Sequence, residues 1–268
     1  MVIYDSDDSD LLIQSLSENL KSATAVLDRI HQGTQPLNSV IVLAACAGAN
    51  CGACGYPGCA GYAAAVARGE APTNACVPGG AEAAAKISEI MGVSAGAGEK
   101  SVAFVRCSGT CGHTREKFQY EGIDSCIAAT RLGGGNGANI CAAGCMGFGD
   151  CVKACPFGAM HIVDGIAQVD RTKCVGCMKC AEACPKKLIT KVPAAATDVV
   201  GCNSTDKGAA VMKYCDFGCI GCQKCKRECP ADAITIENFL AVIDQSKCVH
   251  CGHCSDVCPR HVIVDYNG

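Results

Sequence analysis

The run Cys-x2-Cys-x2-Cys-x3-Cys-Pro occurs three times, at residues 174–185, 219–230 and 248–259. In such a run the first three thiolates bind one four-iron cluster, and the fourth cysteine ligates the other cluster of a pair. Zinc also accepts four thiolates, but its sites use two separated Cys-x2-Cys hooks, which leave the third cysteine without a tetrahedral role. The run therefore predicts paired [4Fe–4S] clusters, which constrains the fold more than any other feature.

The crossing of the fourth cysteine assigns ligands in two tandem modules. In the second module one set is Cys219, Cys222, Cys225 and Cys258, and the other is Cys248, Cys251, Cys254 and Cys229. In the first module one set is Cys174, Cys177, Cys180 and Cys155. We expect each set to hold one cluster, with iron bound through these cysteines.

The remaining site of the first module lacks one ligand, because Phe148 stands where the second module has Cys222. Its three other cysteines are Cys145, Cys151 and Cys184. We expect Cys141 to supply the fourth thiolate. The alternative is a three-iron cluster held by three thiolates.

The repeat extends beyond the cysteines, since residues 144–156 and 218–230 align without a gap and strand-like segments at 101–106 and 197–201 precede them. We expect an α+β protein with a pseudo-duplicated sequence. The expected parts are an N-terminal amphipathic helix and connector (1–45), a small helical cluster domain (46–98), and two ferredoxin-like modules (99–193 and 194–268). Helices are predicted at 9–32 and 79–91.

A different spacing, Cys-x2-Cys-x4-Cys-x16-Cys, joins Cys51, Cys54, Cys59 and Cys76. Glycines between these cysteines let the backbone close around a metal and direct N–H groups at sulfur. By spacing alone the site favours an iron–sulfur cluster and leaves zinc open.

Six cysteines belong to none of these sets: Cys46, Cys107, Cys111, Cys126, Cys202 and Cys215. One interpretation is that they are small buried residues. The other is that Cys107, Cys126, Cys202 and Cys215, which flank the two repeats, bind a further cluster between the modules. The sequence thus predicts five [4Fe–4S] clusters, and a sixth under the second interpretation.

Composition excludes several classes of protein. The acidic N-terminus lacks the pattern of a signal peptide, so the 26 cysteines favour metal over disulfides. No apolar run approaches the roughly 20 residues of a membrane span, and a net charge of −3 without a basic tract argues against nucleic acid. No nucleophile–base constellation is recognisable, so we expect no catalytic residues and no substrate site of the chain's own.

The stretches GANCGACGYPGCAGY, NACVPGG and GCMGFGDCVKACPFGA resemble the B subunit of the Rnf complex, as do GCNSTDKG and GCIGCQKCKRECPADAI. The resemblance covers about residue 47 to the C-terminus, and it implies that Cys51, Cys54, Cys59 and Cys76 hold the family's first cluster. It also implies an electron-transfer subunit of a membrane ferredoxin:NAD⁺ oxidoreductase that pumps sodium ions or protons. The family begins with a hydrophobic anchor, whereas this chain begins with an acidic, amphipathic segment.

The resemblance implies that the chain takes low-potential electrons from reduced ferredoxin and passes them to partner redox subunits. We expect a cytoplasmic location, peripheral at the inner face of the cell membrane through those subunits. The alternative is the electron wire of a soluble, non-pumping oxidoreductase. Because ferredoxins are acidic, docking needs a local basic patch, either Lys224, Lys226 and Arg227 or the pair Lys186 and Lys187.

Overall fold

The computed structural model describes residues 37–94, 100–132 and 135–265 of the chain. The chain divides into two compact units after Gly98, and each is described by itself. The helix predicted at 9–32 lies outside the described residues.

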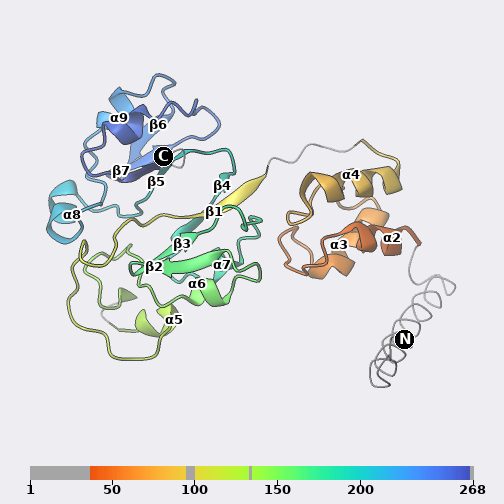
Figure 1. The fold of residues 1–268 in the computed structure, drawn as a ribbon, viewed down its shortest axis with the longest axis horizontal. Coiled ribbons are helices and arrows are strands. Elements are labelled where there is room, and N and C mark those ends of the chain that lie inside the picture. The colour runs from red at the N-terminus through yellow and green to blue at the C-terminus, as the bar shows by residue number, and fades with distance from the viewer. Residues whose placement is uncertain (1–36, 95–99, 133–134, 266–268) are drawn as a thin grey trace, which may run out of the picture. The chain divides into compact units, whose positions relative to one another are not determined.

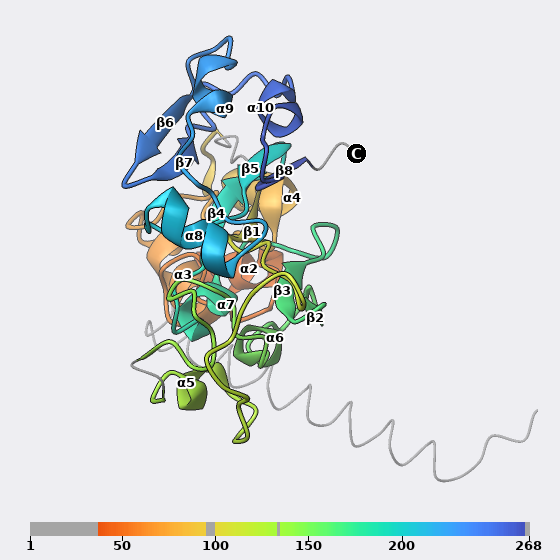
Figure 2. The ribbon, with the colours of Figure 1, turned by 90° about the vertical axis from the view of Figure 1, so that its left-hand side faces the viewer.

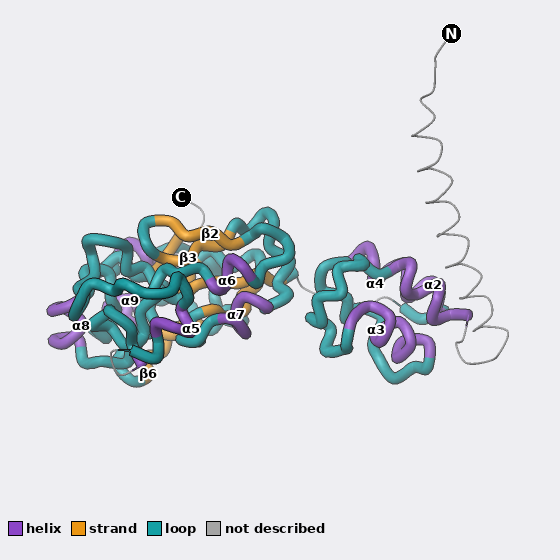
Figure 3. The backbone as a smooth tube through the Cα atoms, turned by 90° about the horizontal axis from the view of Figure 1, so that it is seen from below, coloured by secondary structure: helices purple, strands orange, loops and turns teal. Residues whose placement is uncertain are grey.

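Where the structure describes the first unit, at residues 37–94, it consists of three helices and the loops between them, as Figure 3 illustrates. The helices are α2 (Leu37–Ala45), α3 (Gly58–Ala67) and α4 (Gly80–Met91). Val42, Tyr62, Val66 and Ile87 are almost completely buried and form its core. Helix α4 confirms the prediction at 79–91, and it ends at Gly92, whose left-handed conformation allows its N–H to reach the carbonyl of Glu89.

The described residues of the second unit form eight strands in four two-stranded antiparallel sheets, which can be followed in Figures 1 and 2. In its first half β1 (Ser101–Val105) pairs with β4 (Ile189–Pro193), and β2 (Met160–Val163) forms a hairpin with β3 (Ile166–Val169). In its second half β5 (Asp198–Val200) pairs with β8 (Ile263–Asp265), and β6 (Ile234–Glu237) forms a hairpin with β7 (Leu240–Ile243). The strands expected at 101–106 and 197–201 are therefore β1 and β5.

Short helices connect these strands. They are α5 (Cys126–Ala129), α6 (Asp150–Lys153), α7 (Lys179–Ala183), α8 (Gly208–Tyr214), α9 (Lys224–Arg227) and α10 (His253–Asp256). The two halves repeat with an offset of 74 residues: β6 begins 74 residues after β2, and β8 begins 74 residues after β4. The mixed helix and strand composition agrees with the α+β prediction.

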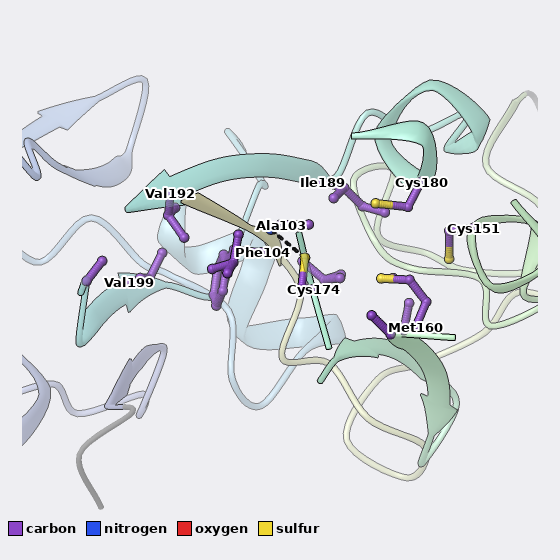
Figure 4. Packing of buried hydrophobic residues seen from close by; sticks show 14 residues of the cluster. Ala103, Phe104, Cys151, Met160, Cys174, Cys180, Ile189, Val192 and Val199 are labelled. Atoms are coloured by element: carbon purple, nitrogen blue, oxygen red, sulfur yellow. Dashed lines mark hydrogen bonds between the residues drawn. The ribbon is translucent and has the colours of Figure 1, made fainter. Parts of the chain in front are cut away.

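Cysteines form part of the core of the second unit. Cys151, Cys174 and Cys180 are buried among Phe104, Met160 and other apolar side chains (Figure 4). Since thiols occupy positions that aliphatic side chains fill in an ordinary core, whatever binds these thiols also stabilises the fold.

The described helices are short. The longest of them, α4, has 12 residues, whereas a membrane-spanning helix needs about 20. Among the described residues, therefore, none of the helices could reach across a bilayer.

Candidate metal centres

In the second module, the structure brings Cys219, Cys222, Cys225 and Cys258 around one hollow. Helix α9 carries Cys225 on its buried side, and burial raises the pKa of this thiol to about 11. A metal must therefore displace protons from these thiols at neutral pH. The grouping is the one that the crossing of the fourth cysteine predicts.

The second set of this module gathers beside a buried carboxylate. Cys248 lies near Cys229 and Cys251, which raise its pKa, and burial raises the pKa of Cys254 to about 12. Asp198 is 1% exposed, and its Oδ1 lies 3.6 Å from the Sγ of Cys254. This site thus combines the four predicted cysteines with a carboxylate that the sequence did not reveal.

The corresponding set of the first module has an alanine in place of that carboxylate. Burial, together with the neighbouring thiols of Cys174, Cys177 and Cys155, raises the pKa of Cys180 to about 12. The backbone N–H of Ala103 donates to the Sγ of Cys174 at 3.3 Å, drawn as the dashed line in Figure 4. In the strand registers Ala103 pairs with Lys191 and Asp198 pairs with Asp265. The partner residues Lys191 and Asp265 are related by the 74-residue repeat, so Ala103 and Asp198 occupy equivalent positions.

N–H groups point at sulfur in both modules. Ala159 donates to the Sγ of Cys155 at 3.4 Å, and Ala233 donates to the Sγ of Cys229 at 3.3 Å. Hydrogen bonds of this kind stabilise thiolate charge and help to set the potentials of iron–sulfur clusters. In both modules the donor lies four residues after the cysteine, so Cys155 and Cys229 have the same backbone environment.

The structure differs from the prediction at the site with Phe148. The hollow at this site is lined by Cys126, Cys145, Cys151 and Cys184. Cys126 and Cys184 both raise the pKa of Cys145, whereas Cys141 does not line this hollow. The structure thus places Cys126, rather than the expected Cys141, beside the other three cysteines of this set.

A short helix places Cys126. Ser125 caps α5, and its Oγ accepts a hydrogen bond from the N–H of Ala128 at 3.3 Å. The carboxylate of Asp150, the first residue of α6, accepts from the Oγ of Ser125 and from the N–H of Ile127, both at 3.0 Å. Cys151 follows Asp150 directly, so this contact ties two ligand-bearing helices together.

Phe148 has a structural role instead. Its ring packs against Tyr120, with the ring centroids 4.8 Å apart. Phe148 thus packs the loop before α5 against the cysteine loop, in place of binding a metal.

Cys141 belongs to a second hollow, here called the module-bridging site, where it lies with Cys107, Cys202 and Cys215. Cys145, which also lines the hollow with Cys126, Cys151 and Cys184, lies at the edge of both. Cys202 and Cys215 raise the pKa of Cys141, and with burial the value is about 11. The additional site expected between the modules therefore contains Cys141 in place of Cys126. Each module contributes one cysteine that follows its first strand and one that precedes its cysteine run.

The module-bridging site is linked through the backbone to a neighbouring set in each module. The N–H of Cys145 donates to the Sγ of Cys107 at 3.4 Å. In the other module, the backbone N–H of Cys219 donates to the Sγ of Cys202, which partly offsets the rise in the pKa of that thiol caused by burial. One ligand residue on each side thus contacts both its own set and the bridging set.

Two arginines place positive charge at this site. Burial raises the pKa of the Cys215 thiol, and the guanidinium of Arg260, which donates to the carbonyl oxygen of the same residue, partly offsets that rise. Arg106 lines the hollow, and the charge of Cys202 raises its pKa against the effect of burial. Such cations favour thiolates in the interior.

In the first unit, Cys51, Cys54, Cys59 and Cys76 line one hollow. The side chain of Asn50 accepts a hydrogen bond from the N–H of Cys59 at 2.9 Å, which folds the loop over this hollow. A β-carbon at position 79 would lie 2.4 Å from the Cβ of Ala83 and 3.0 Å from the Sγ of Cys76, so the packing of α4 beside this thiol requires glycine there.

Cys46 is a neighbour that the spacing did not indicate. Burial and the nearby thiols of Cys76, Cys59 and Cys54 raise its pKa to about 12. Cys111, in contrast, is exposed and joins none of the sets.

The donor sets fit [4Fe–4S] clusters. Each of the six groups offers at least four thiols, and among the described residues backbone N–H groups are directed at sulfur in five of them. Loops that bring three cysteines to one hollow have no use in a tetrahedral zinc site. The chemistry of the donors thus agrees with iron and sulfide.

Family models match both units. A putative Fe-S cluster model matches residues 47–78, and 4Fe-4S dicluster domain models match residues 136–191, 173–233 and 218–263. These matches cover the first-unit loops and both modules.

Curated relatives match most of the chain. The B subunit of the Na⁺-translocating ferredoxin:NAD⁺ oxidoreductase complex of Acetobacterium woodii is 47% identical over 224 residues, which cover 83% of this chain and 67% of the relative. The chain belongs to the family of Rnf complex B subunits. The proton-translocating counterpart from Clostridium ljungdahlii is 47% identical over 80% of this chain and 76% of its own length.

A third B subunit, from an ion-translocating oxidoreductase complex of Methanosarcina acetivorans, is 42% identical over 81% of each chain. As a member of this family of Rnf B subunits, the chain is an electron-transfer protein with multiple [4Fe–4S] clusters.

Proposed function

We propose that the chain holds six [4Fe–4S] clusters and relays electrons from reduced ferredoxin to partner subunits of an Rnf-type complex. The observation that carries this proposal is the module-bridging site. Its Cys107 and Cys202 sulfurs accept hydrogen bonds from the backbone N–H groups of Cys145 and Cys219. A site linked to both modules turns two separate cluster pairs into one continuous path.

The proposed ligands keep four of the predicted sets and revise the others. The unchanged sets are Cys51, Cys54, Cys59 and Cys76; Cys155, Cys174, Cys177 and Cys180; Cys219, Cys222, Cys225 and Cys258; and Cys229, Cys248, Cys251 and Cys254. The revised sets are Cys126, Cys145, Cys151 and Cys184, and Cys107, Cys141, Cys202 and Cys215.

The clusters supply one-electron redox chemistry at low potential. The protein supplies thiolates, N–H donors and an interior that excludes water from the sulfurs. The arginines at the module-bridging site favour added negative charge there, which suits a site that electrons must cross between modules.

The names of the relatives support the proposed partners of this chain. Those proteins are subunits of ferredoxin:NAD⁺ oxidoreductase complexes that translocate Na⁺ or protons. By the same relation, this chain receives electrons through its ferredoxin-like modules and delivers them from the Cys51 site to a partner in the complex. It acts at the inner face of the membrane through these partner subunits.

The test is to add reduced ferredoxin to the anaerobically purified chain. Reduction is measured as the bleaching of the visible cluster absorbance. We expect complete bleaching by ferredoxin and by dithionite. A Cys51→Ala variant should still accept electrons from ferredoxin but fail to pass them to the partner subunits. A chain that dithionite bleaches but ferredoxin does not would contradict the proposed donor.

A further inference from the structure

We propose that one surface of the second module docks an acidic electron-carrier protein of the ferredoxin class. The α9 surface consists of helix α9, the loop 219–222 and the turn between β6 and β7, which lie together in Figures 1 and 2. The inference rests on the proposed function, because it names the place where the donor binds.

Charge distinguishes α9 from the other helices that carry a cluster cysteine. Lys224, Lys226 and Arg227 are exposed on either side of the buried Cys225. Helices α6, α7 and α10 each include an acidic residue, whereas α9 includes none. Within the described part of the chain, no carboxylate forms an ion pair with these three cations.

A proposed ligand is exposed at the same place. Of the cysteines in the six sets, all of which lie among the described residues, only Cys222 and Cys251 are exposed. Cys222 stands in the loop that leads into α9. Because electron transfer is fastest over short distances, an exposed ligand beside unpaired cations marks a place for a charged redox partner rather than for a lipid.

An exposed aromatic side chain completes the α9 surface. Phe239, in the β6–β7 turn, is 46% exposed, and its carbonyl oxygen lies 3.8 Å from the Sγ of Cys219. A β-carbon at Gly221 would lie only 2.8 Å from that oxygen, so the turn packs directly on the cysteine loop. Aromatic anchors next to charged residues are typical of protein–protein interfaces.

The structure also decides against the other basic patch that the sequence suggested. The ammonium of Lys186 donates to the carbonyl oxygens of Gly135 and Ala142, at 2.9 and 2.7 Å, and to the side chain of Asn136 at 3.2 Å. Lys186 is thus engaged in holding the loop at 135–142. Lys187 alone does not form a patch.

The experiment compares two triple charge reversals in the cluster-loaded chain. The α9 variant is Lys224→Glu, Lys226→Glu, Arg227→Glu, and the matched control is Lys187→Glu, Lys191→Glu, Lys213→Glu, whose lysines are also exposed in the second unit. The readout is the second-order rate of reduction by reduced ferredoxin at increasing salt. We expect a loss of about tenfold or more for the α9 variant at low salt, a change within about twofold for the control, and convergence at high salt.

Further readouts separate docking from its alternatives. Iron content and the rate of dithionite reduction should be unchanged in the α9 variant. A Phe239→Ala variant should slow reduction by ferredoxin several-fold at all salt concentrations, since its contribution is not electrostatic.

Equal ferredoxin rates for the α9 variant and the control would overturn the docking site. A wild-type chain that ferredoxin cannot reduce, although dithionite can, would instead overturn the proposed donor. Binding to phosphatidylglycerol vesicles that depends on α9, combined with unchanged reduction by ferredoxin, would assign the surface to lipid and contradict the proposal.

Discussion

The two ferredoxin-like modules share their strands and cysteine spacing but differ at two positions that matter for metal binding. Phe148 of the first module stands where the second has Cys222, and Ala103 of the first occupies the place of Asp198. The first module therefore lacks one thiol of the run, and the second module has a carboxylate that the first lacks. The backbone framework thus tolerates changes of ligand and of charge in one module that the other does not share.

The missing thiol is replaced from a distant part of the chain. Cys126 has no counterpart in the second module, and it lies in the hollow that Phe148 leaves short of a ligand. Cys141 does have a counterpart, Cys215, and both line the module-bridging site. Cys126, which the second module lacks, therefore takes the place of the cysteine that the first module lacks at position 148.

The largest expected effect comes from removing this replacement. In Cys126→Ala, three thiols remain at the site, so we expect a three-iron EPR signal in the oxidised protein. Phe148→Cys in the same chain should abolish that signal, because it restores the ligand found in the second module.

The control for this rescue is Cys141→Ala with Phe148→Cys. Since Cys141 serves the module-bridging site, the added cysteine should not repair the defect. Rescue of Cys141→Ala but not of Cys126→Ala would reverse the assignment of these two cysteines.

A smaller effect is expected from exchanging the second difference. The carboxyl group of Asp198 lies 3.6 Å from the Sγ of Cys254. Negative charge beside a cluster disfavours an added electron, so Asp198→Ala should raise the potential of the cluster held by Cys248, Cys251, Cys254 and Cys229. A shift of about 60 mV corresponds to a tenfold change in a one-electron equilibrium. A redox titration followed by EPR measures it, and Ala103→Asp should lower the potential of the equivalent first-module cluster. Unchanged potentials in both variants would show that the carboxylate does not act on the cluster.

The smallest effect concerns the helix that carries Cys126. Ser125→Ala removes the cap of α5 and its contact with Asp150, which should cost about 1 kcal/mol. We expect iron release to a chelator about fivefold faster from this site. Thr205→Ala, an exposed substitution in the other module, is the control, and equal rates for the two variants would argue against a role for the cap.

Much of the site could be predicted because the ligands are close in sequence. The runs at 174–185, 219–230 and 248–259 predict the same cysteine sets that the structure brings together. The strands at β1 and β5 and helix α4 followed from their patterns. Local spacing is sufficient where one loop wraps one metal.

The rest could not be predicted from local spacing. Helix α5 has four residues and no periodicity, and it is positioned by the tertiary contact between Ser125 and Asp150. Closeness in sequence to Cys145 favours Cys141 as its co-ligand, whereas the repeat pairs Cys141 with Cys215, and the structure places these two around one hollow. That pairing, together with the pairing of Cys107 with Cys202, was the signal that could have identified the module-bridging site.

The central claim is that the module-bridging site holds a cluster of its own. The direct measurement is iron per chain in anaerobically purified protein, for the wild type and for Cys107→Ala, Cys202→Ala, with the exposed Cys111→Ala as control. Six four-iron clusters predict about 24 iron atoms in the wild type and in the control, and about 20 in the double variant. Equal iron in the wild type and the double variant would contradict the claim.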